Sequence, residues 1–552
     1  MSDVRVLLLY PRFAQESFWR NLDLARLKGA RCMAPPLGLI TVAALLPARW
    51  EARLCDLNAR ALDPADLDWA DVVFVSGMLP QRQEALAAVA AVQAAGKVVV
   101  VGGPDVSSSP EAYAAADFRV LGEAEATLDA FVAAWEGGAR SGLITAPEER
   151  PDVTRTPVPR FDLLNLPDYL FVGVQFSRGC PFTCEFCDII ELYGRVPRTK
   201  TTAQMLAELE ALYALGYRGH VDFVDDNLIG NKKAVKAFLP HLIEWQRAHG
   251  HPFHFSTEAS LNLADDSALL DLMAQAGFYL VFVGIESPDP EVLRSTQKKQ
   301  NTRRDIAASV HRIYAAGIVV IAGFIVGFDN ESPDAADAMA ELIEEAAIPV
   351  VSLGLLYALP DTQLSRKLER EGRMFPLKEE DFRHGDQTGA GLNFATLEPR
   401  IDVLRRYREV YARVYAPGAF FGRIRRLSEL VGRQAGDAAS SEPPAPPAPV
   451  DVRQLVADLA RLFGVLATVA WRHPRVAVHI WLVALRGLKR LDRLEQLLSL
   501  ALFYMHLGPF SRKVVRDVSR QIAEIEAGRW VDPRPEVAGP AQGGASPLRA
   551  AE

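Results

Sequence analysis

Three cysteines stand close together in the sequence, at positions 180, 184 and 187, in the pattern C-x3-C-x2-C. The 552-residue chain has only two others, Cys32 and Cys55. An odd, clustered set of five does not suit a disulfide framework and is typical of a metal site in a reducing compartment. Three thiolates on one loop can reach three corners of an iron–sulfur cubane. Cys180, Cys184 and Cys187 are therefore predicted to hold a [4Fe–4S] cluster whose fourth iron stays open to a small molecule.

The alternative for the same cysteines is a zinc site completed by a histidine. The next histidine along the chain is His220, which stands far from the cysteines at the start of a predicted strand. Because no fourth cysteine lies nearby either, the spacing favours the cluster.

The elements that would position this loop form a regular series of strands and helices. Apolar, strand-like runs alternate with helical stretches, at 172–177, 220–224, 253–257, 280–285, 319–326 and 350–356. Six such units predict an α/β barrel, complete or partial, with its site at the carboxyl ends of the strands. The cysteine loop directly follows the first strand and is expected at that end.

Polar residues recur where the other predicted strands end. Asp225 and Asp226 follow the second strand, Glu258 follows the third, and Glu286 and Ser287 follow the fourth. Any one of them alone could be a helix cap or a solvated loop residue. Their repetition at the same end of successive strands favours a binding site.

An earlier series of strands and helices occupies residues 4 to about 135, with apolar runs at 4–10, 53–57, 72–76, 98–101 and 118–121. Short, nearly continuous apolar strands between helices indicate a parallel sheet covered on both faces. Such sheets bind ligands beyond the carboxyl ends of their strands, where glycine lets a large flat molecule approach the backbone. The candidate contacts in this Rossmann-like domain are Asn58, Ser76, Gly102 and Gly103.

The cysteine motif after the first barrel strand, with the aromatic Phe186 before its last cysteine, resembles the radical S-adenosylmethionine (SAM) superfamily. The resemblance implies that SAM chelates the open iron and is cleaved by an electron from the cluster, giving a 5′-deoxyadenosyl radical that abstracts hydrogen. It also implies that Asp225 and Asp226 lie near the methionyl amino group, and that Glu286 and Ser287 lie near the ribose.

The fifth barrel strand carries a second part of the resemblance. Gly323-Phe-Ile-Val-Gly327 is similar to the adenine motif of the superfamily, although Glu331 stands one residue late for the glutamate that ends this motif. Gly323 and Gly327 are therefore expected near the adenine.

A Rossmann-like domain ahead of the barrel is similar to the cobalamin-binding branch of this superfamily, and the resemblance runs from residue 4 to about 430. Within that branch, the runs 177–188 and 223–232 look most like hopanoid C-methylases and related uncharacterised proteins. Many corrinoid carriers ligate cobalt through the histidine of a D-x-H-x-x-G motif. In the matching stretch after Asp56, this chain has Asn58 and Ala61 at the histidine and glycine positions. An amide is a poor cobalt ligand, so cobalamin is expected to bind without a histidine below the metal; the alternative is a vestigial or nucleotide-binding sheet.

The resemblance implies a cobalamin-dependent methyl transfer to an unactivated carbon of a small molecule or of a lipid such as a hopanoid. It also implies a reductant such as flavodoxin or ferredoxin. Two alternatives stay open: oxidative cyclisation or rearrangement without methyl transfer by the same cofactors, and a non-catalytic cobalamin or iron–sulfur sensor. The formal net charge of −8 offers no basic surplus for nucleic acid.

The predicted fold class is α/β with an α-helical C-terminal region. Its parts are a Rossmann-like cobalamin-binding domain (1–140), a linker (141–165), a partial (β/α)6 radical SAM barrel (166–375), a helical extension (376–433), a Pro/Ala-rich spacer (434–450), a C-terminal helical region (451–530) and a disordered tail (531–552).

The C-terminal region contains apolar helical stretches at 476–488 and 494–507 with basic residues around them. Neither stretch is long enough to span a bilayer, and the N-terminal residues do not resemble a secretory signal, so a cytoplasmic protein is expected. Two arrangements of these helices stay open. They lie on the inner face of the membrane, or they form a hairpin that packs its apolar faces on itself or on the barrel.

Overall fold

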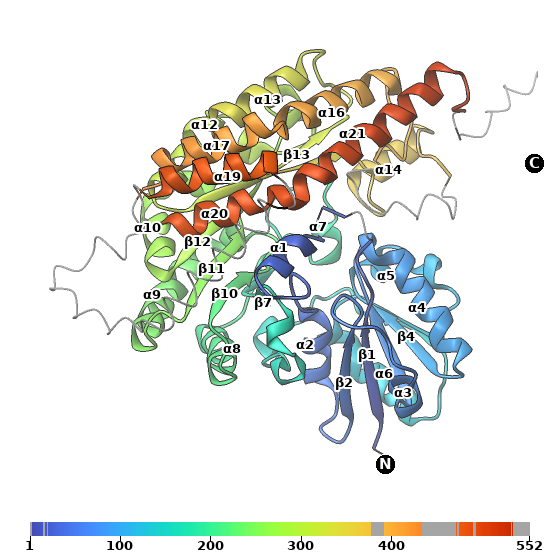
Figure 1. Ribbon diagram of the computed structural model, residues 1–552. Coiled ribbons are helices and arrows are strands. Elements are labelled where there is room, and N and C mark those ends of the chain that lie inside the picture. The colour runs from blue at the N-terminus through green and yellow to red at the C-terminus, as the bar shows by residue number, and fades with distance from the viewer. Residues whose placement is uncertain are drawn as a thin grey trace, which may run out of the picture.

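The computed structural model describes residues 3–14, 17–18, 20–376, 391–432, 471, 474–488, 493–531 and 533. Figure 1 shows an N-terminal sheet domain in blue, a second α/β domain in green and yellow, and C-terminal helices in orange and red. The spacer predicted at 434–450, the first part of the predicted C-terminal helical region and nearly all of the predicted tail lie outside the described residues.

The N-terminal domain is built on a parallel sheet of strand order β2-β1-β3-β4-β5-β6. The strands are β1 (Arg5–Tyr10), β2 (Glu51–Asp56), β3 (Val72–Ser76), β4 (Val98–Gly102), β5 (Phe118–Leu121) and β6 (Gly142–Thr145). Side chains alternate along β1, so Leu7 and Leu9 enter the core on one face of the sheet and Val6 and Leu8 enter the core on the other. The predicted doubly covered, Rossmann-like sheet is confirmed.

Helices cover both faces of this sheet. On one side lie α3 (Pro64–Trp69), α4 (Arg82–Ala94) and α5 (Pro104–Ser108); on the other lie α2 (Leu37–Leu45) and α6 (Ala124–Glu136). The order in which the chain adds strands to the sheet changes direction between β1 and β3. Doubly wound sheets bind ligands at such a point, beyond the carboxyl ends of the strands. The loops after β1, β2, β3 and β4 border that position.

One strand of this sheet departs from the sequence prediction. β6 lies inside the range predicted as a linker, 141–165, and pairs in parallel with β5. It is a short edge strand whose side chains are mostly exposed, so it lacks the apolar run that marks a buried strand. The sheet therefore extends beyond residue 140.

The second domain contains a parallel sheet of strand order β14-β13-β12-β11-β10-β7, each strand pairing with its neighbour along the chain. Its strands are β7 (Val172–Val174), β10 (Gly219–Phe223), β11 (Phe253–Glu258), β12 (Phe278–Glu286), β13 (Val319–Val326) and β14 (Val351–Leu355). The connecting helices include α8 (Thr202–Ala214), α9 (Lys232–Ala248), α10 (Ser267–Ala276), α12 (Ile306–Ala315) and α13 (Ala335–Glu345). The sheet is not closed, which confirms the partial (β/α)6 barrel.

The first barrel strand ends earlier than predicted. β7 stops at Val174, and the chain then forms β8 (Ser177–Arg178), which pairs antiparallel with β9 (Arg198–Thr199). Asp225 accepts hydrogen bonds from the backbone N–H groups of Phe176 and Ser177. The buried Asp225 carboxylate takes the place of the backbone oxygens that a neighbouring strand would offer to these N–H groups. The chain therefore leaves the sheet here and turns toward the cysteines.

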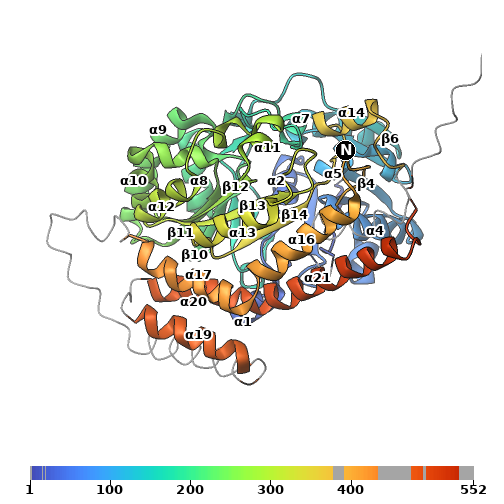
Figure 2. The ribbon, with the colours of Figure 1, turned by 90° about the horizontal axis from the view of Figure 1, so that it is seen from above.

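Helices follow the last barrel strand. They are α14 (Gln363–Arg370), α16 (Arg400–Val414), α17 (Pro417–Leu430), α19 (Pro474–Gly487), α20 (Leu494–Leu502) and α21 (Tyr504–Glu526). The first of them, α14, lies against the cysteine loop, where Leu364 donates its N–H to the oxygen of Glu185 at 2.8 Å, and the others form a layer outside the barrel. Figures 1 and 2 show α21 lying along α16, and α21 also contacts α1 (Leu22–Leu27) of the N-terminal domain. Within the described residues, no helix combines the length and the apolar character needed to cross a membrane.

Candidate active site

A sharp turn at Gly179 leads from β8 into the cysteine loop. Gly179 has a φ of 93°, and a Cβ at this position would lie 2.8 Å from the carbonyl oxygen of Gly194. Glycine tolerates this left-handed and crowded backbone, whereas other residues do not. Cys180 donates its N–H to the same Gly194 oxygen at 3.2 Å, and Cys187 donates to the oxygen of Cys184 at 3.2 Å. These bonds hold the cysteine loop at both ends.

Amide groups from two other loops lie against the thiols. Asn227 Nδ2 is 3.8 Å from Cys180 Sγ, and Gln300 Nε2 is 3.7 Å from Cys184 Sγ. Burial raises the pKa of both thiols, and raises that of Cys187 further. A ligand sulfur must lose its proton, so occupancy by metal and thiol ionisation are coupled. Amide donors aimed at the sulfurs suit thiolates that ligate a cluster and tune its potential.

Among the described residues, no group of three or more His, Cys, Asp or Glu side chains is arranged to hold one metal ion. A zinc ion needs its ligands around a single centre. In a cubane, by contrast, each thiolate binds its own iron at a separate corner.

The end of β10 carries two carboxylates with different partners. Asp225 is buried and also accepts the hydroxyl hydrogen bond of Ser177, and burial raises its pKa to about 7. Asp226 accepts the N–H of Gly179 at 3.1 Å, at the turn that precedes the first cysteine, and burial raises its pKa to about 6. Asp225 therefore shapes the exit from β7, while Asp226 lies directly beside the cysteine loop.

Glu258 ends β11 and faces the same part of the barrel. Its side chain is reached by solvent, although protein surrounds it on most sides. Desolvation, followed by the nearby carboxylates of Asp222, Asp226 and Asp225, raises the pKa of Glu258 to about 8. The carboxyl ends of β10 and β11 thus form an acidic region next to the cysteine loop.

Glu286 and Ser287, at the end of β12, are both buried. Glu286 has a φ of 71°, an uncommon backbone conformation for a residue with a Cβ, and its carboxylate pairs with Lys298 Nζ at 2.6 Å. Burial lowers the pKa of Lys298, but Glu286 and the Cys184 thiol outweigh that effect and raise it. Ser287 Oγ accepts the N–H of Asp289 at 3.1 Å. The pair of Glu286 and Lys298 joins the end of β12 to the loop after α11, and it places the Lys298 charge close enough to Cys184 to act on that thiol.

Gly323 and Gly327 lie on and just after β13. Gly323 stands opposite Gly284 in the register, and a Cβ at Gly323 would lie 3.1 Å from the Phe282 ring. Glu331 Oε1 accepts the N–H of Gly327 at 2.8 Å, and its other oxygen pairs with Arg406 at 3.4 Å. The glutamate that stands one residue late in the sequence therefore folds back onto the glycine motif.

Asn58 follows β2 in the N-terminal domain, and protein groups occupy its side-chain amide. Its Oδ1 accepts the N–H of Phe13 at 2.9 Å, and its Nδ2 donates to Pro11 O at 3.1 Å and to Asp56 Oδ1 at 2.8 Å. The amide ties the loop after β1 to the loop after β2, and these bonds leave it poorly placed to act as a cobalt ligand.

Ser76, Gly102 and Gly103 meet at the ends of β3 and β4. Gly103 has a φ of 98°, and a Cβ there would lie 2.4 Å from Ser76 Oγ. Directly beyond, Arg82 and Asp105 form a buried bidentate pair that also receives the Tyr113 hydroxyl at 2.6 Å. The edge of the sheet therefore has no side chains at the two glycines and is braced behind them by a charged pair, which suits a large flat ligand.

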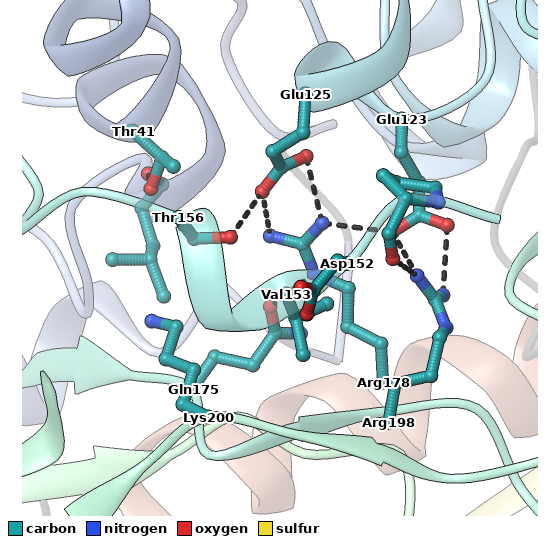
Figure 3. A network of polar contacts seen from close by, with 12 residues as sticks. Thr41, Glu123, Glu125, Asp152, Val153, Thr156, Gln175, Arg178, Arg198 and Lys200 are labelled. Atoms are coloured by element: carbon teal, nitrogen blue, oxygen red, sulfur yellow. Dashed lines mark hydrogen bonds and ion pairs between the residues drawn. The ribbon is translucent and has the colours of Figure 1, made fainter.

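An ion-pair network joins the two domains beside the cysteine loop (Figure 3). Arg178, two residues before Cys180, donates to Glu123 Oε2 at 2.8 Å and pairs with Glu125 Oε1 at 2.8 Å. Arg198 pairs with Glu123 Oε1 at 2.7 Å. Glu123 is the N-cap of α6 and Glu125 lies in its first turn, where the helix dipole favours negative charge.

Comparison with protein families matches residues 174–343 to the Radical SAM superfamily, 30–132 to the B12 binding domain and 362–520 to a domain of unknown function, DUF4070. The chain is 48% identical over 431 residues to an uncharacterized methyltransferase of Synechocystis sp., covering 78% of this chain and 79% of that one. It is 35% identical to the hopanoid C-2 methylase of Rhodopseudomonas palustris, covering 93% and 94%. This chain belongs to the cobalamin-dependent radical SAM methylase family.

Solved structures agree with the family's fold. TsrM from Kitasatospora setae, a radical SAM methyltransferase, matches with a TM-score of 0.54 at 18% identity, covering 68% of this chain and 78% of that chain. The cobalamin-dependent SAM radical enzyme OxsB matches with a TM-score of 0.57 at 14% identity, covering 96% and 82%.

Family membership makes the chain a radical SAM methyltransferase whose cofactors are a [4Fe–4S] cluster, SAM and cobalamin. The residues present fit these groups. Three cysteine sulfurs with amide donors suit the cluster, and the glycines at the end of β4 leave room at the sheet edge for a corrin.

Several residues that contact or border the candidate site were not predicted from the sequence. Lys298 and Gln300 come from the loop after α11 (Pro290–Ser295), and their polar sequence Lys-Lys-Gln looks like an ordinary exposed loop. Arg178 precedes the cysteines, but only folding reveals its partners on α6. Two arginines follow the cysteines: Arg198 meets a carboxylate and Arg195 is exposed.

Proposed function

We propose that this methylase transfers a methyl group to an unactivated sp3 carbon of a lipid of the hopanoid class. The geometric support is the ion-pair network, which holds the carboxyl edge of the N-terminal sheet against the start of the cysteine loop. Two cofactors held this way can act on one substrate between them. The lipid class is supported by the hopanoid C-2 methylase, which matches this chain over nearly the full length of both, including the C-terminal helices.

In this proposal the residues predicted from the sequence hold the cofactors. Cys180, Cys184 and Cys187 ligate the cluster, and Asp225, Asp226, Glu258, Glu286, Ser287, Gly323 and Gly327 surround SAM. Asn58, Ser76, Gly102 and Gly103 border cobalamin, with Asn58 shaping the loops rather than ligating cobalt. When bound, the cluster and SAM supply a radical that abstracts hydrogen, and cobalamin supplies the methyl group.

The remaining residues of the site position these groups. Lys298 neutralises Glu286 and places a cation near Cys184, and Asn227 and Gln300 donate to cysteine sulfurs. Glu331 fixes the backbone of the glycine motif after β13. Because solvent and other molecules that reach the site can quench a radical intermediate, such a site must also exclude them. The electron comes from a small reductant such as flavodoxin or ferredoxin.

The test uses the full chain, purified and reconstituted without oxygen, with a hopanoid, a reductant and SAM labelled in its methyl group. The expected result is labelled, methylated hopanoid together with 5′-deoxyadenosine. Cys184→Ala is expected to lose the absorbance of the cubane and to form neither product, while Arg195→Met, an exposed change in the same segment, keeps both. A product without label would contradict methyl transfer and favour oxidative ring formation or rearrangement.

A further inference from the structure

The outer face of α19 is apolar although it is exposed. The side chains of Val478, Trp481, Leu482, Leu485 and Leu488 are 60%, 43%, 44%, 58% and 57% exposed. Each of the five stands three or four residues from another member of the set. This spacing places them in one line along a helix. We call these five residues the α19 stripe. Contiguous apolar surface of this kind marks a site of interaction with a protein or a membrane.

The opposite face of α19 is used for folding. Ala477, Ile480 and Val483 are buried, and α19 packs against α17 and α20. α20 buries Leu497, Leu498 and Leu500 in the main core. The helical hairpin predicted as one arrangement of this region is therefore present for α20 and for one face of α19, and the α19 stripe is left outside it.

Cations gather beside the α19 stripe. Residues 474–488 contain Arg475 and Arg486 and no acidic residue. Burial lowers the pKa of His479, so this residue adds no charge at neutral pH, and Arg486 pairs with the exposed Glu429 of α17 at 3.8 Å. Arg425, on the neighbouring α17, has a buried Nη1 without a hydrogen-bond partner among the described residues. Burial, and then the like charges of Arg486 and Arg426, lower the pKa of Arg425. A nearby anion would relieve this repulsion and satisfy the unpaired donor.

We infer that the α19 stripe, with Arg425 and Arg486, docks the enzyme on the surface of an anionic lipid bilayer. A helix with tryptophan and leucine on one face and arginine at its flanks lies in the plane of the membrane interface. At 1.5 Å per residue, the ten steps from Val478 to Leu488 present about 15 Å of apolar edge. The absence of acidic side chains from residues 474–488 complements anionic headgroups. Docking would bring the barrel to an apolar substrate. The inference depends only on the α19 stripe and its arginines, and it goes beyond the proposed reaction.

The test is flotation of the full chain with vesicles of phosphatidylcholine alone or with 30% phosphatidylglycerol. Binding to the anionic vesicles is expected, weakening as salt screens the charges. The double variant Leu482→Glu and Leu485→Glu is expected to weaken it at least tenfold for each leucine. Arg425→Gln and Arg486→Gln are expected to weaken binding to anionic vesicles about fivefold each. Leu143→Glu and Leu397→Glu, at exposed leucines far from α19 in sequence, are matched controls expected to bind as the unaltered chain does.

Circular dichroism and cobalamin absorbance of each variant check that it is folded. Failure of the unaltered chain to float with anionic vesicles would overturn the inference, as would unchanged binding by the double leucine variant. Self-association abolished by the leucine changes, without vesicle binding, would assign the α19 stripe to a contact between copies of the chain and also overturn it. None of these outcomes bears on methyl transfer, which is measured on dispersed substrate.

Discussion

Arg178 offers the most direct test of how the two cofactor domains are held together. Its side chain is 12% exposed and lies between Glu123 and Glu125 of α6, which are 3% and 8% exposed. Arg178→Met keeps much of the side-chain volume but removes the charge and all the hydrogen bonds. Two carboxylates at the domain interface then lose a shared partner, although Arg198 still pairs with Glu123.

The size of the effect follows from the pKa of Glu125. Burial alone would raise this pKa, but the hydrogen bond and charge of Arg178, helped by hydrogen bonds from the Thr156 hydroxyl and a backbone N–H, outweigh burial and hold it at about 2, below its ordinary 4.5. That difference corresponds to about 3 kcal/mol in favour of the ionised, paired carboxylate. Because the pKa is lowered by folding, this stability is fully present above pH 4.5 and is lost as the pH falls toward 2.

The assay combines stability with product ratios. Urea unfolding at pH 7 is expected to show that Arg178→Met costs about 3 kcal/mol, and a double-mutant cycle with Glu125→Gln should give a coupling of about 2 kcal/mol. Since the cysteine loop and the SAM residues belong to the barrel, 5′-deoxyadenosine should still form, while methylated product per 5′-deoxyadenosine falls several-fold because the cobalamin domain is no longer held in place. Arg195→Met, an exposed change nearby, is the control.

Two results would refute this reasoning. A coupling energy below about 0.5 kcal/mol would mean that the ion pair contributes no more than an exposed one. An unchanged ratio of methylated product to 5′-deoxyadenosine would mean that other contacts position the cobalamin domain.

Three further predictions concern individual residues. Gly103→Ala should weaken cobalamin binding at least tenfold and destabilise the N-terminal domain by about 1–3 kcal/mol, because the added Cβ meets Ser76 Oγ on a backbone of positive φ; equilibrium dialysis and melting measure both. Asn58→Ala should cost about 1–3 kcal/mol by leaving Phe13 N–H unpaired, while the Co(II) electron paramagnetic resonance spectrum stays the same, with no axial nitrogen coupling in either protein. The pKa of Glu258 is raised to about 8, so the unaltered apo chain should lose stability as the pH rises from about 4.5 through 8; Glu258→Gln should melt higher than the unaltered chain at pH 9 and no higher at pH 4.

Residue type and spacing were enough to predict the iron–sulfur cofactor and the two α/β domains, and they predict the three cysteines as the ligands of the cluster. Thiolates on one loop have few uses other than metal binding, and buried parallel strands require long apolar runs. Both features can therefore be recognised from neighbouring residues in the sequence. The edge strand β6 has no such sequence pattern, because a strand that is exposed along most of its length needs no apolar run. The same limit applies to the end of β7, which Asp225 sets from another strand.

What the sequence alone determined was which residues are available for chemistry: three clustered cysteines, carboxylates at the strand ends, and no histidine where Asn58 stands. What only the tertiary structure decided was which groups meet. Lys298 reaches Glu286, Arg178 reaches α6, and the outer face of α19 stays exposed in the part of the chain that the structure describes. Local periodicity fixes which residues share a face of a helix or strand. The partner of that face depends on contacts between segments far apart in the chain, and single-chain patterns carry no trace of these.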